Sequence, residues 1–207
     1  MMYDVVFKSG IVGLLIWVLL FLTSTAALAI AIRCAWSLRK RRILSPELPP
    51  QLESHLALGD LNQAYEICRN DGTVMARIAN AVFENAHRQN RVVRQETAMT
   101  ALDKQAREIL RQINSLSMCA NIAPMLGLLG TVTGMVDAFV GLGTSMGPEK
   151  ASLLAIAIAQ ALYTTAAGLL IAVPAIAVTV IFRNTLERRV EVLSEDVEKI
   201  LQAIPGD

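Results

Sequence analysis

Residues 11–32 read IVGLLIWVLLFLTSTAALAIAI and contain no charged side chain. As a helix rising 1.5 Å per residue, this stretch would be about 33 Å long, which matches the hydrocarbon core of a bilayer. The sequence therefore predicts a first membrane span here. Two further mostly apolar stretches, 118–143 and 152–182, predict a second and a third span. The fold class that follows is an all-α integral membrane protein with three transmembrane helices.

The composition agrees with helices packed in lipid. The 207-residue chain is 54% hydrophobic but only 5% aromatic. Ala, Val, Ile and Leu supply most of the apolar side chains, whereas aromatic rings supply much of the buried area in a soluble core. The formal net charge of +1 indicates no particular partner.

Basic side chains gather at one end of each predicted span. Because such residues accumulate on the cytoplasmic side of a membrane, we expect the N-terminus to face outward and the C-terminus to lie in the cytoplasm. The basic residues concerned are Arg33, Arg39, Lys40, Arg41 and Arg42 after the first span, Lys104, Arg107 and Arg111 before the second, and Arg183, Arg188 and Arg189 after the third.

This topology predicts six segments, from an outward-facing N-terminus to a cytoplasmic C-terminal helix. The second and third spans are each expected to continue into a long cytoplasmic helix. The segments are 1–33 for the N-terminus and first span, 34–117 for a cytoplasmic helical part, 118–143 for the second span, 144–151 for a short outer loop, 152–182 for the third span and 183–207 for the C-terminal helix.

A signal peptide is the alternative interpretation of the first apolar stretch. Ala27-Leu28-Ala29 resembles a cleavage site. However, a signal peptide has a basic region before its apolar stretch, and here Lys8 is offset by Asp4. The basic residues lie after the stretch instead, so a membrane span is favoured.

The predicted cytoplasmic part contains short helices and two long amphipathic ones. Ser45-Pro46 and Pro49-Pro50 are expected to break the chain. Helices are predicted from Leu61, with Asp60 as N-cap, to about Arg69, where Asp71-Gly72 ends the helix, and over 73–87. From about Arg91 one long helix is expected to run into the second span.

Two apolar stripes at helical spacing mark these long helices: Leu102, Ala106, Ile109, Ile113 and Leu116, and then Leu186, Val190, Leu193, Val197 and Ile200. They either pack on one another within one subunit or contribute partly to a subunit interface.

The sequence contains no pattern typical of an enzyme, a metal site or a nucleic-acid interface. Cys34, Cys68 and Cys119 are too widely spaced for a CxxC motif, and the two histidines stand alone. No phosphate-binding, zinc-protease or serine-hydrolase motif occurs. We therefore expect no catalytic residue, no metal and no cofactor. Acidic and basic residues alternate on the amphipathic helices, which argues against nucleic-acid binding.

Polar residues inside the second and third spans are the candidate functional groups. Thr131 and Thr165 lie near the middle of their spans, which run in opposite directions, so both are expected near the bilayer midplane. Gln160 and Thr164 lie one turn apart and closer to the outer side. An amide in hydrocarbon needs a partner or water, whereas threonine can bond back to its own helix. Each lone threonine is thus either functional or simply back-bonded.

Asp137 and Pro174 are the remaining candidate residues in the second and third spans. Asp137 lies near the outer interface, where it is either a hydrated surface residue or a contact for an ion or partner. Pro174 should kink the third span, because its ring crowds the carbonyl group of Leu170. No titratable residue lies at the midplane, so a partner would have to supply one for proton conduction.

Two motifs resemble the MotA/TolQ/ExbB family of proton channels, and ExbB and TolQ most of all. Residues 121–134, NIAPMLGLLGTVTG, look like the family's second-span signature. Residues 158–168, IAQALYTTAAG, followed by AVPA at 172–175, look like its third-span signature. The cytoplasmic stretches LGDLNQA at 58–64, Cys68-Arg69 and Ala76-Arg77 are also similar. The resemblance covers the topology of the whole chain and is most specific between 115 and 183.

The resemblance implies an assembly and a mechanism. Family members form a homopentamer around the single helices of a partner, ExbD or TolR, that carries a membrane aspartate. The complex in the inner membrane uses the proton-motive force to drive work through TonB or TolA. Carried over, Thr131 and Thr165 would face the central pore near that aspartate. Neutralising the aspartate would remove its preference for a threonine-lined site, so that the partner steps onward.

Gln160 departs from the family pattern, in which a glutamate is common at this position. An amide cannot carry a proton as a carboxylic acid does, so this departure argues against a relay role for Gln160. Asp137 occupies a position where relatives also have asparagine, and it is given no relay role.

Several functions remain open. The ExbB-like one is energising TonB-dependent transport across the outer membrane. A TolQ-like role in envelope integrity and cell constriction is the main alternative. A non-conducting membrane scaffold is a third. A MotA-like flagellar stator fits poorly, because such subunits have four spans and a larger cytoplasmic domain. A membrane enzyme is disfavoured by the lack of clustered acids, bases or metal ligands.

Overall fold

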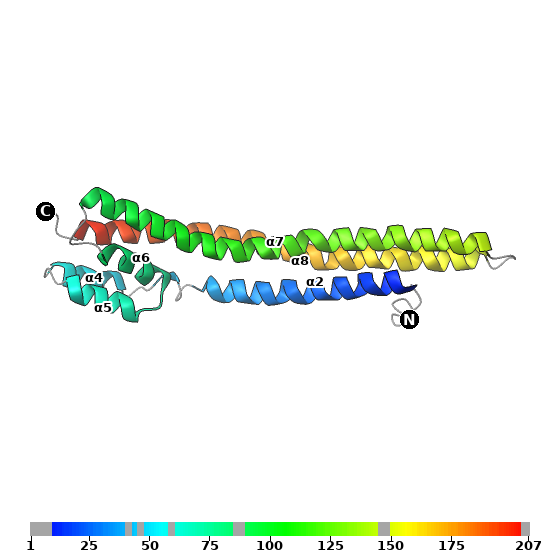
Figure 1. Ribbon diagram of the computed structural model, residues 1–207, viewed down its shortest axis with the longest axis horizontal. Coiled ribbons are helices and arrows are strands. Elements are labelled where there is room, and N and C mark those ends of the chain that lie inside the picture. The colour runs from blue at the N-terminus through cyan, green and yellow to red at the C-terminus, as the bar shows by residue number, and fades with distance from the viewer. Residues whose placement is uncertain are drawn as a thin grey trace. The chain divides into compact units, whose positions relative to one another are not determined.

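A computed structural model of the chain describes residues 10–39, 43–44, 48–57, 61–84, 90–144 and 150–203. The described residues contain helices and no strand, which confirms the all-α prediction (Figure 1). Asp60, His87, Ser45-Pro46 and most of the predicted outer loop lie outside the described residues. The helices are α2 (Gly10–Ser37), α4 (Leu48–Ala57), α5 (Leu61–Asn70), α6 (Val74–Phe83), α7 (Arg91–Thr144) and α8 (Lys150–Ala203).

Three of these helices are long and apolar enough to cross a membrane. The candidate spans are Val12–Ser37 in α2, Arg91–Gly141 in α7 and Leu154–Ala203 in α8. The number of spans predicted from the sequence is therefore confirmed by length and composition. Both α7 and α8 are continuous helices of 54 residues. This confirms that one long helix includes the second apolar stretch and that another includes the third.

The chain divides into two compact units. Unit 1 comprises Met1–Ile32 and Asn114–Val180, and unit 2 comprises Arg33–Ile113 and Ile181–Asp207. Unit 1 thus contains most of α2 and the apolar parts of α7 and α8. Unit 2 contains α4, α5 and α6 together with the other ends of the two long helices.

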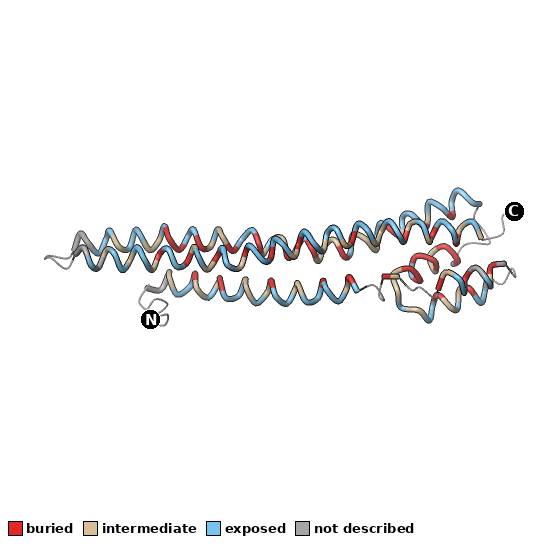
Figure 2. The backbone as a smooth tube through the Cα atoms, turned by 180° about the vertical axis from the view of Figure 1, so that it is seen from behind, coloured by how far each residue is buried: buried red, intermediate tan, exposed pale blue. Residues whose placement is uncertain are grey.

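Unit 1 is a bundle of three helix segments in which α7 and α8 run side by side (Figures 1 and 2). Each helix buries one face and exposes the other, as expected of helices that meet lipid on their outer side. Large apolar residues such as Phe21, Leu162 and Leu170 are exposed. Small residues dominate the buried face of α7 and α8, and two large residues contribute from α2. The buried residues include Ile16, Leu20, Ala27, Leu116, Ala120, Ala123, Ala161, Ala172 and Ala175.

Unit 2 builds a small core from the three short helices. The helices α4 and α5 contact each other, as do α5 and α6. Helices of ten residues are marginal alone, so this packing supplies their stability. The N-terminus of α6 is capped by Thr73, whose hydroxyl accepts a hydrogen bond from the backbone N–H of Ala76 at 3.2 Å. The core side chains include Leu52, Leu56, Met75, Ile78, Val82 and Phe83.

The two apolar stripes are largely buried within a single chain (Figure 2). Leu102, Ile109 and Ile113 of α7 are buried in unit 2, while Ala106 is only half-buried. In α8 Val190 is half-buried, and Leu186, Leu193, Val197 and Ile200 are buried. Most of each stripe therefore packs inside the subunit. A subunit interface would have to use the half-buried positions and the opposite faces.

Three local predictions differ from the structure. Pro49-Pro50 does not break the chain but lies in the first turn of α4. The first backbone N–H groups of a helix lack intrahelical partners, so prolines there cost no hydrogen bond. The helix predicted over 73–87 begins at Val74 and ends at Phe83, with Glu84 as C-cap. The first helix also extends past Arg33 to Ser37.

Candidate functional site

The two apolar helix segments of α7 and α8 approach each other closely at a pair of glycines. A Cβ atom on Gly127 would lie 2.9 Å from the carbonyl oxygen of Thr164 and 2.9 Å from the Cα of Thr165. A Cβ atom on Gly168 would lie 2.6 Å from the carbonyl oxygen of Ala123. These obstacles are backbone atoms, so only glycine fits at either position. Close backbone approach of this kind is a main source of packing energy in lipid.

The carbonyl oxygen of Gly127 accepts hydrogen bonds from two threonines of the facing helix. The hydroxyl of Thr165 donates to it at 2.9 Å, and the hydroxyl of Thr164 at 3.1 Å. Thr164 also donates to the carbonyl oxygen of Ala161 at 2.7 Å, so it shares its single proton between two acceptors. A polar group in an apolar environment is costly unless it is bonded, and here both hydroxyls are bonded.

Thr131 lies one helical turn beyond Gly127 on α7. Its hydroxyl donates to the carbonyl oxygen of Leu128 in its own helix, at 2.7 Å. Because Thr165 contacts Gly127, the two threonines Thr131 and Thr165 lie about one turn apart along the helices. Their depth in a membrane stays a prediction. Thr131 and Thr164 are buried within the single chain, whereas Thr165 is half-buried.

The other predicted residues lie around this cluster in different environments. Gln160 is half-buried and lies one turn before Thr164 on α8. Asp137 is exposed near the end of α7. Pro174 is also exposed, and α8 continues through it without interruption, so the kink stays a prediction. The structure thus brings Thr164 and Thr165 together at Gly127, with Thr131 nearby, and leaves Asp137 and Pro174 apart from them.

The sequence placed Gly127 only within the motif at 121–134. Its role as a shared acceptor was missed, because that role depends on which residues of α8 face it. The glycines at 127, 130 and 134 are spaced three and four residues apart, which is the available signal for a close helix contact. A third buried threonine, Thr179, was not among the predicted site residues; its hydroxyl donates to the carbonyl oxygen of Ala175 at 2.7 Å.

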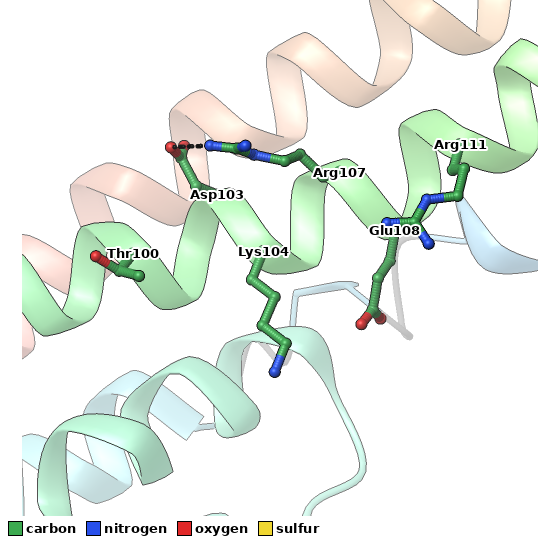
Figure 3. A pocket seen from close by; sticks show the side chains of 6 residues that line it. All are labelled: Thr100, Asp103, Lys104, Arg107, Glu108 and Arg111. Atoms are coloured by element: carbon green, nitrogen blue, oxygen red, sulfur yellow. Dashed lines mark hydrogen bonds and ion pairs between the residues drawn. The ribbon is translucent and has the colours of Figure 1, made fainter.

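Two hollows among the described residues of unit 2 are each lined by a single helix. One, of about 400 Å³, lies along α7 and is lined by side chains of both charges (Figure 3). Arg107 and Asp103 form an exposed ion pair there at 3.3 Å. All the lining residues belong to one helix, so no second element encloses a ligand. The residues are Thr100, Asp103, Lys104, Arg107, Glu108 and Arg111.

No metal centre is formed by the residues that the structure describes. Among them, no group of three or more His, Cys, Asp or Glu side chains could hold an ion. Cys68 is buried in α5, and burial together with the nearby Asp71 carboxylate raises the pKa of its thiol to about 12. Such a thiol is protonated and unreactive at neutral pH.

Comparison with known proteins identifies the family of this chain. Residues 70–199 match the family described as MotA/TolQ/ExbB proton channel. The biopolymer transport protein ExbB of Neisseria gonorrhoeae is 29% identical, over 93% of this chain and 90% of its own. Biopolymer transport protein exbB1 of Vibrio cholerae is 40% identical, over 44% of this chain and 40% of its own. The Tol-Pal system protein TolQ of Haemophilus influenzae is 35% identical, over 46% of this chain and 40% of its own. The matched region includes the whole threonine and glycine cluster.

Proposed function

Since the chain belongs to the MotA/TolQ/ExbB proton channel family, we propose that it is the pore-forming subunit of a motor in the bacterial inner membrane. The motor draws on the proton-motive force and energises TonB-dependent transport across the outer membrane. Relatives named biopolymer transport protein ExbB, one of them aligned along nearly the whole chain, support this role. The family is one of channels rather than enzymes.

The proposed assembly is a homopentamer around a central pore. The pore holds the single helices of an ExbD-like or TolR-like partner that carries a membrane aspartate, and a TonB-like protein receives the work. The N-terminus faces the periplasm, and residues 34–117 and 183–207 lie in the cytoplasm. The exposed apolar faces of unit 1 would meet lipid or neighbouring subunits.

The observation that carries the proposal is a hydroxyl cluster without a titratable group. No Asp, Glu, Lys, Arg or His occurs between residues 118 and 136 or between 151 and 182. The middle of both spans instead presents Thr131, Thr164 and Thr165. A proton path needs at least one titratable group, which the partner's aspartate would supply. Each proton moving through about 150 mV would release roughly 3.5 kcal/mol.

Within this site Thr165 has the most direct proposed role. It is half-buried, so it can meet a partner helix as well as Gly127. Thr131 would line the path one turn away. Gln160 and Thr164 would complete it toward the outer side, where the glutamine amide supplies hydrogen bonds but no proton relay. Asp137 would contact an ion or the partner near the outer interface.

Proton flux into proteoliposomes tests the proposal. The liposomes would contain this chain with an ExbD-like partner, and the flux would be driven by an imposed potential. The double variant Thr131→Ala, Thr165→Ala should reduce the flux at least tenfold. The matched control is Thr25→Ala, because Thr25 is an exposed threonine of α2 that bonds only to its own helix. Wild-type flux in the double variant would count against the pore role. Absence of flux in the wild-type complex would favour a non-conducting scaffold.

Native mass spectrometry of the same complex tests the assembly. Five copies of this chain with fewer copies of the partner are expected. A monomer or dimer that ignores the partner would contradict the pentameric pore.

A TolQ-like role in envelope integrity is the second candidate, favoured by the similarity to TolQ of Haemophilus influenzae. Both roles share the same pore chemistry, so in vitro flux does not separate them. Deleting the gene distinguishes the two roles. Impaired uptake of iron or a vitamin would indicate the ExbB-like role, whereas a leaky envelope and defective constriction would indicate the TolQ-like one.

A further inference from the structure

The last turn of α2 is held in one orientation by contacts on one of its faces. Cys34 is buried there, and so is Leu38, whose backbone N–H bonds to the carbonyl oxygen of Cys34 at 2.8 Å. Beside this face, the hydroxyl of Ser37 donates a hydrogen bond to the side-chain oxygen of Gln112 on α7, at 3.1 Å. These contacts determine which side chains at the end of α2 point away from the protein.

Trp36 is the large side chain on the opposite face. Successive helix residues are about 100° apart, so Trp36 is turned roughly 160° away from Cys34. It is 65% exposed.

Two exposed arginines flank Trp36. Arg33 lies three residues before it, which makes the two side chains neighbours on the helix surface. Arg39 follows three residues after it, and its backbone N–H bonds to the carbonyl oxygen of Trp36 at 3.3 Å. The end of α2 thus presents one indole between two guanidinium groups.

These three side chains offer hydrogen-bond donors and no acceptor. A guanidinium has five N–H groups and an indole has one. None of the ion pairs among the described residues uses Arg33 or Arg39. The sequence supplies no acid nearby, because no Asp or Glu occurs between residues 5 and 46. The chemical complement of this surface is therefore an anion with acceptor oxygens.

The position of Trp36 indicates which anion meets this surface. Trp36 lies in the last turn of the candidate membrane span Val12–Ser37. Tryptophan is enriched where a span leaves the hydrocarbon, because its ring contacts acyl chains while its N–H reaches the headgroups. Phospholipid phosphates lie at this depth, and the planar guanidinium fork matches two phosphate oxygens.

We propose that Arg33, Trp36 and Arg39 form a binding site for the phosphate headgroup of an anionic phospholipid, at the membrane surface where α2 ends. The phosphate accepts hydrogen bonds from the two guanidinium groups and the indole N–H, and the acyl chains lie against the Trp36 ring. A zwitterionic lipid is bound less well, because its ammonium group is repelled by the arginines. The site does not depend on a pore role of the threonine cluster.

Quenching of tryptophan fluorescence by brominated acyl chains reports which lipid touches Trp36. The chain has two tryptophans, so Trp17→Phe leaves Trp36 as the sole fluorophore of this kind. The full chain is reconstituted in phosphatidylcholine bilayers, and a rising fraction of the lipid is replaced by brominated phosphatidylglycerol or by brominated phosphatidylcholine. The ratio of the two quenching affinities gives the preference for the anionic lipid. A preference of about tenfold is expected, because each arginine at a membrane surface is worth about 1 kcal/mol.

The matched probe is Trp17, which lies in the other half of α2 and is seen alone in Trp36→Phe. It has no arginine beside it in the sequence, so its quenching should show no preference between the two lipids.

Substitution of one arginine tests whether the site is local. In the Trp17→Phe background, Arg33→Gln should lower the preference at Trp36 about fivefold, the effect of about 1 kcal/mol. Arg77→Gln removes the same charge from an exposed position of the short helix α6, outside the candidate spans, and should leave the preference unchanged.

Three results would overturn the proposal. Equal effects of Arg33→Gln and Arg77→Gln, or no effect of either, would show attraction by the net charge or none at all. A lack of quenching by both lipids would show that protein rather than lipid covers Trp36. Inorganic phosphate added at constant ionic strength should leave the preference unchanged, and its loss would assign the site to a soluble phosphate instead of a headgroup.

Discussion

The hydroxyl of Thr165 lies 2.9 Å from the carbonyl oxygen of Gly127, which precedes it by 38 residues. This bond joins α7 to α8 within unit 1. A slip of either helix by one residue would turn Thr165 away from this acceptor, because successive residues of a helix are about 100° apart. The bond and the close glycine contact therefore set the register of the two helices together.

Replacing Gly127 with alanine should destabilise unit 1. The added Cβ would lie 2.9 Å from two backbone atoms of α8, which cannot turn aside as a side chain can. Overpacking of this kind costs about 1–3 kcal/mol. Thermal unfolding in detergent should show a lower midpoint, and proton flux should fall because Thr165 moves.

Gly141→Ala is the matched control on the same helix. A Cβ there meets nothing within 4 Å. Alanine is favoured over glycine inside a helix by up to about 1 kcal/mol, so this variant should be as stable as the wild type or more so. Equal destabilisation by both variants would contradict the close contact at Gly127.

Two valines of α8 test whether the apolar stripe packs inside the subunit. Val197 is 3% exposed and Val192 is 42% exposed. Val197→Ala should lower the free energy of unfolding by about 2 kcal/mol, because it leaves a cavity in unit 2. Val192→Ala should change it by about 0.5 kcal/mol or less. Denaturant unfolding of each variant measures both values, and equal effects would refute the buried stripe.

Stability above pH 9 should depend on Cys68. The folded-state pKa of its thiol is raised to about 12 by burial and by Asp71, from an ordinary value of 9.0. The unfolded chain therefore loses this proton at lower pH than the folded chain. The contribution of the thiol to stability is complete below about pH 9 and declines as the pH rises toward about 12.

Denaturant unfolding at pH 8 and pH 10 measures this effect. The wild type should lose more stability between the two pH values than Cys68→Ala, in which the titrating group is absent. In addition, iodoacetamide at pH 8 should leave Cys68 unmodified in the folded protein and label it after unfolding. Rapid labelling of the folded protein would contradict its burial.

The ion pair between Asp103 and Arg107 should contribute little to stability (Figure 3). The two side chains are 68% and 74% exposed, and they lie four residues apart on α7. Exposed pairs at this spacing are worth about 0.3–0.5 kcal/mol. Asp103→Asn should shift the free energy of unfolding by no more than that, and 1 M salt should remove the difference. A loss of 2 kcal/mol would show that Asp103 has another partner.

The long helices could be predicted because the sequence patterns that mark them extend over many residues. An uncharged stretch marks each apolar part, and the stripe from Leu102 to Leu116 continues at the same period toward the second span, so one helix accounts for both. The short helices were less predictable. Pro49 and Pro50 have the same local signature whether they stop a helix or begin one, and the difference lies in tertiary contacts such as those of the buried Leu52.

The hydrogen bonds of the threonines could not be predicted from the sequence. The sequence singled out Thr131, Thr164 and Thr165 as polar groups in an apolar environment. It could not show that Gly127 would be their acceptor, because the pairing of residues between α7 and α8 depends on how the small side chains of both helices interlock. A local pattern on one helix contains no such information.

The glycines of this contact differ in whether a second substitution could relieve the clash that an added Cβ would cause. At Gly130 the atoms that would obstruct a Cβ belong to the side chain of Thr164, including its own Cβ at 2.7 Å. Shortening Thr164 to glycine would remove that obstacle. At Gly127 and Gly168 the obstructing atoms include backbone atoms at 2.9 and 2.6 Å, which no substitution can remove. A genetic screen should therefore recover intragenic suppressors of Gly130→Ala at position 164, and none of comparable strength for Gly127→Ala or Gly168→Ala.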